Sequence, residues 1–195
     1  MTTEQDLVYL LVPDFEVTCG RKGFPHPTLT ELCTELTGIT QETVDNADTF
    51  PAVWKRFCEF LAEHKVTENP DSFAFLTCGD WDLKIMLPKQ LKYEASVAPP
   101  TSPISTTLPS PFDRVINIKI AFGALYKLHS RRGMARMLRW LKLELEGRHH
   151  SGIDDCRNTA RIVGKMLEDG WKPKVTEGSP AATKAVTRVS PPSSM

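Results

Sequence analysis

Four carboxylates and one histidine, spread along most of the chain, have the side-chain types that metal-dependent cleavage of phosphodiester bonds requires. Asp14 and Glu16 follow one apolar run, Asp82 follows another, and His150 lies five residues before Asp155. Carboxylate oxygens bind hard divalent cations, and an imidazole with a pKa near neutrality can take a proton from an attacking water. If these side chains meet at one point, they can hold two metal ions that activate a phosphate.

Each motif taken alone also has a simpler interpretation. The Asp-x-Glu pair could mark the solvent-facing end of a strand, Asp82 could be a helix N-cap, and Asp154 also suits a cap. His149 and His150 together suggest a zinc ligand pair, but neighbouring residues rarely converge on one metal, and neither an HxxxH spacing nor a cysteine supports it. The combination of motifs therefore carries the prediction, and no single motif does.

Short secondary-structure elements must position these side chains. Three apolar runs predict buried strands over residues 7–14, 72–78 and 115–120. Side chains alternate along a strand, so the two acids of the Asp-x-Glu pair are expected to point to the same side. Amphipathic patterns predict helices over residues 28–36, 50–64, 83–91 (kinked at Pro88), 121–128, 134–141 and 154–169. Strands separated by helices indicate an α/β layered domain.

The chain of 195 residues is long enough for one domain with a sizeable core, which we place at residues 1–175. Residues 96–112 are rich in Pro, Ser and Thr and predict an exposed insertion. Residues 176–195 have a similar composition and predict a disordered tail.

Charge is distributed unevenly along the chain. The formal net charge is +0, yet residues 1–112 carry 16 acidic and 8 basic residues, and residues 114–165 carry 12 basic and 4 acidic residues. The basic region contains the third acidic motif, so a basic surface can lie beside an acidic metal pocket, as a polyanionic substrate requires. A solvated helix face rich in Arg and Lys is the alternative interpretation.

Cysteine usage and hydropathy indicate a soluble protein of a reducing, intracellular compartment. The five cysteines are an odd number, widely scattered, with no CxxC pair, which argues against a disulfide framework. No apolar run approaches the roughly 20 residues of a membrane span, and the N-terminus carries acids where a signal peptide carries basic residues. We expect no membrane partner and a cytoplasmic location, with the nucleus as a second compartment.

The acidic motifs and their flanking residues resemble the DEDDh 3′–5′ exonucleases, and among them the Eri-type RNA exonucleases, which include the enhanced-RNAi and histone-mRNA 3′-end enzymes. The strings that carry the resemblance span residues 7 to about 172: DFEVTC (14–19), LCTELTGIT (32–40), ADTFP (47–51), LTCGDWDLKIMLPKQ (76–90), INIK (116–119), RRGMARML (131–138) and GRHHSGIDDCRNTARI (147–162). The resemblance implies a ribonuclease H-like exonuclease domain.

The resemblance also implies site residues and a reaction. Asp14, Glu16, Asp82 and Asp155 match the four acids that hold two Mg²⁺ or Mn²⁺ ions, and His150 matches the general base. The implied reaction is 3′–5′ hydrolysis of RNA from its 3′ end, with release of 5′-mononucleotides. The substrate residues that it implies are the pocket residues Phe15, Leu36, Thr37, Gly38 and Ile39 and the candidate phosphate contacts Arg131, Arg132 and Arg136. Phe15 and Ile39 are equally consistent with core positions.

The implied partner is RNA with an accessible 3′ end, either small or structured, and RNA-silencing or ribosomal components are further candidates. Two alternatives stay open. The chain could be a catalytically impaired exonuclease-like protein that binds RNA or serves as a silencing scaffold, or it could be a DNA 3′–5′ exonuclease.

Two departures from the family pattern affect the expected sheet. Only residues 20–27 lie where relatives have two further strands, too few for strands with turns. The sheet is therefore expected to have about three strands, with the first strand at its edge. Pro13 precedes the first acid, and an edge strand tolerates a proline there.

Overall fold

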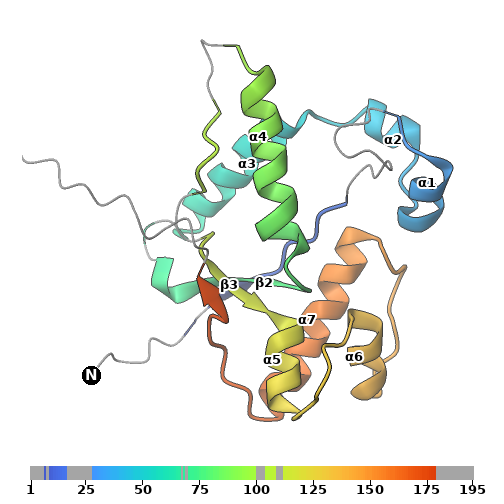
Figure 1. Cartoon of the computed structure of the whole chain (residues 1–195), viewed down its shortest axis with the longest axis vertical. Coiled ribbons are helices and arrows are strands. Elements are labelled where there is room, and N and C mark those ends of the chain that lie inside the picture. The colour runs from blue at the N-terminus through green and yellow to red at the C-terminus, as the bar shows by residue number, and fades with distance from the viewer. Residues whose placement is uncertain are drawn as a thin grey trace, which may run out of the picture.

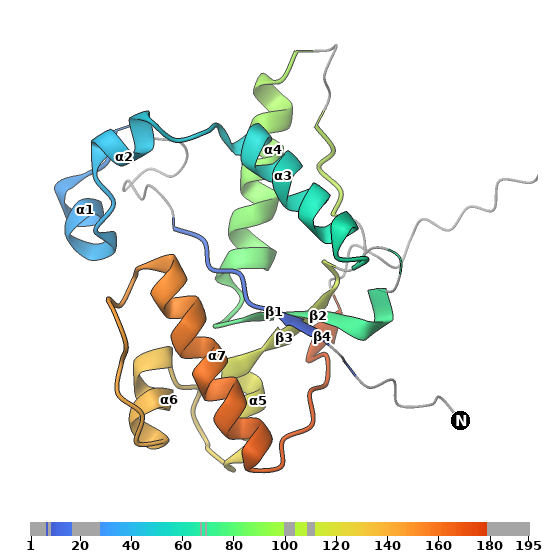
Figure 2. The same ribbon diagram turned by 180° about the vertical axis from the view of Figure 1, so that it is seen from behind.

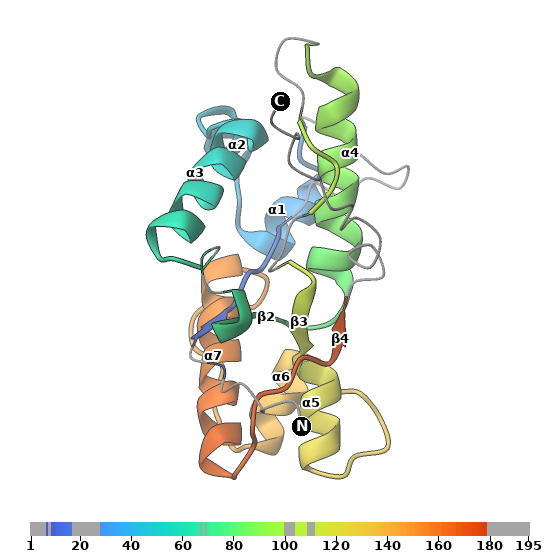
Figure 3. The same cartoon turned by 90° about the vertical axis from the view of Figure 1, so that its left-hand side faces the viewer.

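The computed structural model describes residues 7, 9–16, 28–66, 68, 70–99, 104–108 and 112–178. The segment at residues 20–27, where the two strands were expected to be missing, lies outside these ranges, as do residues 179–195 of the predicted tail. In the described part, a small sheet lies between two groups of helices, which gives three layers (Figures 1 and 3). The α/β fold with a reduced sheet is confirmed.

The sheet has the strand order β1-β2-β3-β4, with β1 at Tyr9–Leu11, β2 at Phe73–Thr77, β3 at Arg114–Asn117 and β4 at Glu177–Gly178. The first three strands are parallel, and β4 pairs antiparallel with β3. The prediction of three strands with the first at the edge is confirmed for the described residues. The two residues of β4 extend the sheet beyond residue 175, where the predicted domain ended.

Two apolar clusters, one on each face of β2 and β3, hold the layers together. Phe73 and Phe75 of β2 pack towards the helices α3 and α4, whereas Ala74 and Leu76 pack towards α5, α6 and α7. All five residues of β2 are buried, as expected for a strand covered on both faces. Figure 2 shows α5, α6 and α7 on one side of the sheet and α3 and α4 on the other.

The helices are α1 at Glu31–Thr37, α2 at Gln41–Asp45, α3 at Phe50–Glu63, a 3-10 turn at Pro70–Ser72, a π-helix at Trp81–Met86, α4 at Leu87–Val97, α5 at Ile118–Leu125, α6 at Met134–Trp140 and α7 at Gly152–Glu168. None of the helices in the described ranges combines the length and the apolar character needed to cross a membrane.

Several predicted boundaries were wrong, because side chains outside the local pattern decide where elements end. The strand predicted to reach residue 120 stops at Asn117, whose side chain accepts from Lys119 N–H and starts α5. Pro88, where a break or kink was predicted, lies in the first turn of α4, directly after the π-helix ends. Pro13 lies beyond the end of β1, so it removes no ladder bond.

The segment predicted as an exposed insertion is partly anchored. α4 continues to Val97, and Ile104, Leu108 and Phe112 pack against the cluster formed with α3 and α4. Phe112 is only 3% exposed and stacks on Phe75 with ring centroids 4.8 Å apart. The composition of this segment concealed three apolar side chains that fix it to the core.

Candidate active site

The four predicted acids line one cavity of about 470 Å³ at the carboxyl ends of the parallel strands. Asp14 and Glu16 follow β1, Asp82 lies in the π-helix that follows β2, and Asp155 lies in the first turn of α7. Ligand sites of open parallel sheets form at this edge because the chain leaves every strand there. The predicted meeting of the four carboxylates is therefore present in the structure.

Asp82 is held in place by the segment that carries the first two acids. Its carboxylate is 6% exposed and accepts a hydrogen bond from the main-chain N–H of Phe15 at 3.1 Å. The alternative that Asp82 is a helix N-cap was wrong, because the N-cap position belongs to Asp80. The π-helix is a conformation that occurs frequently at functional sites.

Helix α7 approaches the first acidic motif closely. A Cβ atom on Gly152 would lie 3.7 Å from Asp14 Oδ2 and 3.7 Å from Glu16 Cγ. The thiol of Cys156, one turn further along, donates to the carbonyl of Val12 at 3.0 Å. These contacts bring Asp155 beside the acids that follow β1.

The crowding of acids raises their proton affinity. Burial raises the pKa of Asp14 to about 7, assisted by the negative charges of Asp82, Glu16 and Asp155. Burial and the negative charges of Asp155 and Asp82 also raise the pKa of Glu16. The pKa of Asp82 is raised by burial, although its hydrogen bond from Phe15 opposes that shift. Like charges at such proximity are typical of sites that bind cations.

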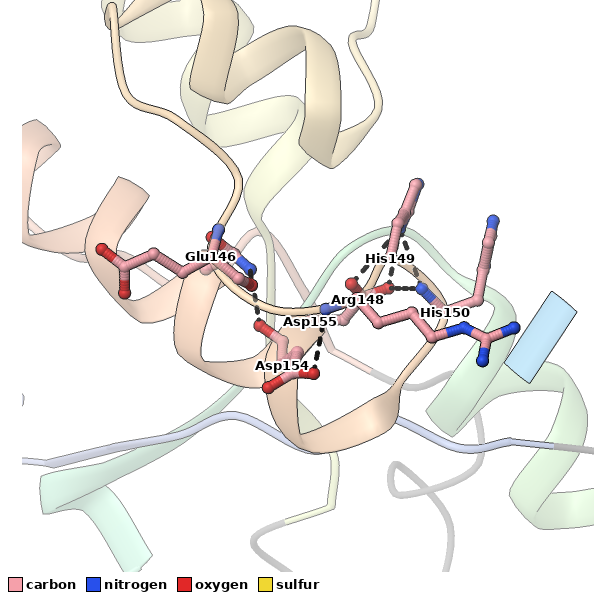
Figure 4. A network of polar contacts seen from close by, with 7 residues as sticks. Glu146, Arg148, His149, His150, Asp154 and Asp155 are labelled. Atoms are coloured by element: carbon pink, nitrogen blue, oxygen red, sulfur yellow. Dashed lines mark hydrogen bonds and ion pairs between the residues drawn. The ribbon is translucent and has the colours of Figure 1, made fainter. Parts of the chain in front are cut away.

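Both histidines of the loop before α7 adjoin Asp155 (Figure 4). Nδ1 of His149 lies 3.1 Å from Asp155 Oδ2, and the main-chain N–H of His150 donates to that oxygen at 3.2 Å. The backbone of His150, at φ +67°, lies in the left-handed region, which residues other than glycine seldom adopt. The local backbone is therefore folded tightly around the carboxylate.

Potential metal-ligand atoms of His149, His150 and Asp155 all lie within 4.8 Å of one another. This proximity was not expected for neighbouring histidines. However, the two rings stack with centroids 3.9 Å apart and planes at 10°. Nearly parallel rings direct their in-plane lone pairs side by side, so this geometry does not favour both imidazoles binding one ion.

Asp154 stabilises the histidine loop and does not cap α7. Ser151 is the N-cap residue, and Asp154 accepts from the main-chain N–H of Arg148 at 3.0 Å. This hydrogen bond, with smaller contributions that include the charge of Arg157, lowers the pKa of Asp154. The prediction that Asp154 is a cap was wrong because the helix begins two residues earlier.

The other wall of the cavity is apolar and comes largely from α1. Of the predicted substrate residues, Phe15, Leu36 and Thr37 line the cavity. Gly38, Ile39, Arg131, Arg132 and Arg136 are not among its lining residues. Leu32 and Trp81, which the sequence analysis did not select, complete the apolar wall at 69% and 49% exposure.

One arginine connects this wall to the histidine loop. The guanidinium of Arg148 donates to the carbonyl of Glu35 near the end of α1. It also lies against Gly38, which is at φ +78° and has no side chain to obstruct it. Gly38 is the C-cap of α1, and its N–H donates to the carbonyl of Thr34.

Comparison with known proteins agrees with the geometry. The family model described as Exonuclease matches residues 12–163, which is most of the chain. The chain belongs to this exonuclease family. The domain is 33% identical to ERI1 exoribonuclease 3 of Homo sapiens, in a match that covers 84% of this chain and 55% of the relative. It is 37% identical to 3'-5' exoribonuclease 1 of Rattus norvegicus, covering 76% of this chain and 40% of that protein.

Solved structures show the same fold for the exonuclease. The nuclease domain of 3'hExo, a DEDDh family member bound to rAMP, superposes with a TM-score of 0.75 at 28% identity, covering 90% of this chain and all of that chain. A 3′-exonuclease recognising the histone mRNA stem-loop gives a TM-score of 0.72 at 28% identity, covering 90% and 88% of the two chains. The chain spans about half the length of the curated relatives it matches.

The donor set of the exonuclease fits the divalent cations on which its family depends. The four carboxylates supply hard oxygen ligands from three separate elements. Among the described residues that line the cavity, Lys119 is the only lysine or arginine. The four carboxylates therefore outnumber the lysine and arginine side chains that line the same cavity.

Lys119 is a site residue that the sequence analysis missed. It follows β3 at the same sheet edge as the acids, and its charge lowers the pKa of Asp82. A Cβ atom on Gly79 would lie 3.1 Å from Lys119 Nζ, so the glycine leaves room for the ammonium group. The position after the third strand was the available signal, but the strand had been predicted to continue through this residue.

Proposed function

We propose that this chain is a 3′–5′ exoribonuclease that hydrolyses phosphodiester bonds at RNA 3′ ends and releases 5′-mononucleotides. The observation that carries the proposal is the convergence of Asp14, Glu16, Asp82 and Asp155 on one cavity together with the loop of His149 and His150. RNA as the substrate is supported by the names of the relatives, which are exoribonucleases.

We assign the four carboxylates as ligands of two Mg²⁺ or Mn²⁺ ions. Asp14 is the acid most affected by the others, because the charges of Asp82, Glu16 and Asp155 all act on it. When bound, such ions polarise the scissile phosphate and stabilise the leaving 3′ oxygen. The raised pKa of Asp14 means that cation binding also displaces a proton from the site near neutral pH.

His150 is assigned as the general base. Its neutral imidazole would take a proton from the water that attacks the terminal phosphate. The backbone hydrogen bond to Asp155 places this residue next to a proposed metal ligand. His149, with Nδ1 beside the same carboxylate, is assigned as a positioning residue for Asp155.

The apolar wall is assigned to the terminal nucleotide. Leu36 and Phe15 would contact the base, while the acids and their ions face the phosphate, a division that suits a nucleotide. Thr37 lies on the same wall, but its hydroxyl already donates to the carbonyl of Cys33. Gly38 and Ile39 shape the turn behind this wall, and Arg131, Arg132 and Arg136 remain candidates for phosphates further from the 3′ end.

The direct test is digestion of an RNA oligonucleotide labelled at its 5′ end, with Mg²⁺ or Mn²⁺ and with EDTA. We expect successive shortening from the 3′ end and nucleoside 5′-monophosphates as products, abolished by EDTA and by Asp14→Ala. A copy of the RNA with a blocked 3′ end controls for internal cleavage.

Three results would contradict the proposal in different ways. RNA binding without turnover in either metal would favour the scaffold alternative. Faster digestion of single-stranded DNA of equal sequence would favour a DNA exonuclease. Cleavage of the blocked RNA would indicate an endonuclease.

A further inference from the structure

A second cavity, of about 340 Å³, lies outside the catalytic site and is lined by Arg132, Arg136, Arg139 and Trp140. Three of these residues belong to α6 and the fourth precedes it by two positions. Arg139 and Trp140 lie three and four residues after Arg136, so the helical period places these three side chains on one face of α6. Arg132, in the segment before the helix, completes the cavity. The sequence analysis had assigned no site to Arg139 or Trp140.

The positive charge of this cavity is not neutralised by the protein. In the ranges that the structure describes, none of the three arginines forms an ion pair with a carboxylate. By contrast, Arg114, Arg157 and Arg161 each have an acidic partner within 3.5 Å. Three guanidinium groups around one hollow repel each other, and an anion between them removes that repulsion.

Arg132 is already oriented for an anion. Its guanidinium carbon lies 4.9 Å from the centroid of the Trp140 ring, a cation–π contact that restricts the side chain. Its Nε is buried and has no hydrogen-bond partner. Because that atom has no accessible surface, an anion in the cavity would bind the terminal nitrogens of the guanidinium group instead.

The two cavities adjoin each other along the chain. Gly133 and Met134 line the catalytic cavity, while Arg132 and Arg136 on either side of them line the second one. Gly133 has no atom within 4 Å of its Cβ position, so no other part of the protein crowds the backbone there. Residues 132–136 thus contribute to both cavities, and a strand that extends from the acids along this segment would meet the arginines.

We propose that the arginine cavity binds a phosphodiester group of the single-stranded RNA substrate, on the 5′ side of the nucleotides held in the catalytic site. This inference rests on the proposed exoribonuclease function. The guanidinium groups contact the phosphate without reading sequence, and the exposed face of Trp140 offers a surface on which a base can stack. The cavity thereby holds a long RNA during successive removal of nucleotides.

The test compares Arg139→Gln with the wild-type protein and with Lys92→Gln. The control removes the same charge from an exposed lysine that lines neither cavity. Binding of a fluorescent single-stranded RNA of about 12 nucleotides is measured in EDTA, which prevents turnover, across a range of salt concentrations. Hydrolysis of a dinucleotide, too short to fill both cavities, is measured with metal.

We expect the arginine variant to bind the long RNA about three- to tenfold more weakly and to lose about 0.7 from the slope of log affinity against log salt, the value for one lost phosphate contact. Dinucleotide hydrolysis should be unchanged, and the lysine control should match the wild type in both assays. Melting temperatures of all three proteins verify folding.

The inference and the proposed function fail in different ways. Unchanged affinity and salt slope in the arginine variant would overturn the inference, even if the wild type degrades RNA. An equal loss in dinucleotide hydrolysis would also overturn it, because the arginines would then belong to the catalytic site. If no protein hydrolyses either substrate while arginine-dependent binding persists, the exoribonuclease function fails and the phosphate site stands.

Discussion

The main-chain N–H of Phe15 donates a hydrogen bond to Asp82 Oδ1 at 3.1 Å, although the two residues are 67 positions apart. Phe15 lies between Asp14 and Glu16, so the backbone that carries the first two acids also orients the third. A change in the backbone direction of either segment would therefore displace three of the four carboxylates together. Metal sites that lose alignment by about 1 Å lose most of their activity.

Asp82→Asn is expected to reduce RNA hydrolysis by at least about 100-fold, because it removes a charged ligand while retaining the hydrogen-bond acceptor for Phe15. The matched control is Asp80→Asn, two residues away. Asp80 pairs with Lys84 at 3.0 Å and is not among the residues lining the catalytic cavity. Hydrolysis rates at saturating Mg²⁺ test this prediction, and equal losses in both variants would contradict it.

His150→Ala and His149→Ala should have different signatures. Loss of the general base should slow the chemical step by about 10²–10⁴-fold and leave metal affinity nearly unchanged. Loss of His149 should weaken metal binding by about 10–100-fold, because its Nδ1 no longer orients Asp155. Calorimetric titration with Mn²⁺ and single-turnover rates separate the two effects. The reverse pattern would exchange the roles of the two histidines.

Without metal, the stability of the domain should fall as the pH rises between 3.8 and about 7. In this window the folded protein keeps a proton on Asp14 that the unfolded chain has already released, so the free energy of unfolding decreases with pH. Added Mg²⁺ or Mn²⁺ should stabilise more strongly at the upper end, since the ions bind the deprotonated acids.

Thermal melts in EDTA across this pH range, with Asp14→Asn as the comparison, measure this effect. The asparagine variant lacks the titrating group and should lose that part of the pH dependence. An identical profile for both proteins would show that Asp14 does not titrate in this window.

Arg148→Ala should raise KM for RNA by about tenfold and leave kcat within about twofold, because it frees α1 from the histidine loop without touching the acids. Arg157→Ala is the matched control, since Arg157 lines neither cavity and pairs only with Asp154 among the described acids. Steady-state kinetics provide both constants. A fall in kcat with unchanged KM would indicate that the apolar wall does not bind the substrate.

The sequence was sufficient to predict the four acids and the elements that carry them, and the structure brings these acids to one cavity. Apolar runs place acids after β1 and β2, and because the structure pairs these strands in parallel, their carboxyl ends lie at one edge of the sheet. Lys119 escaped notice because the side chain of Asn117 ends β3 early, a local hydrogen bond that an apolar pattern does not reveal. Ile104, Leu108 and Phe112 were missed for a related reason, since a Pro/Ser-rich composition obscured their packing.

Chemical type and order along the chain thus predicted the acids and the histidine of the candidate site, because these follow from residue identity and from the motifs that contain them. Tertiary structure alone decided how they are arranged: the stacking of His149 on His150, the link from Arg148 to α1, and the separation of the arginine cavity from the acids. Such contacts join residues from elements with independent local patterns, so their distances exist only once the helices have packed on the sheet.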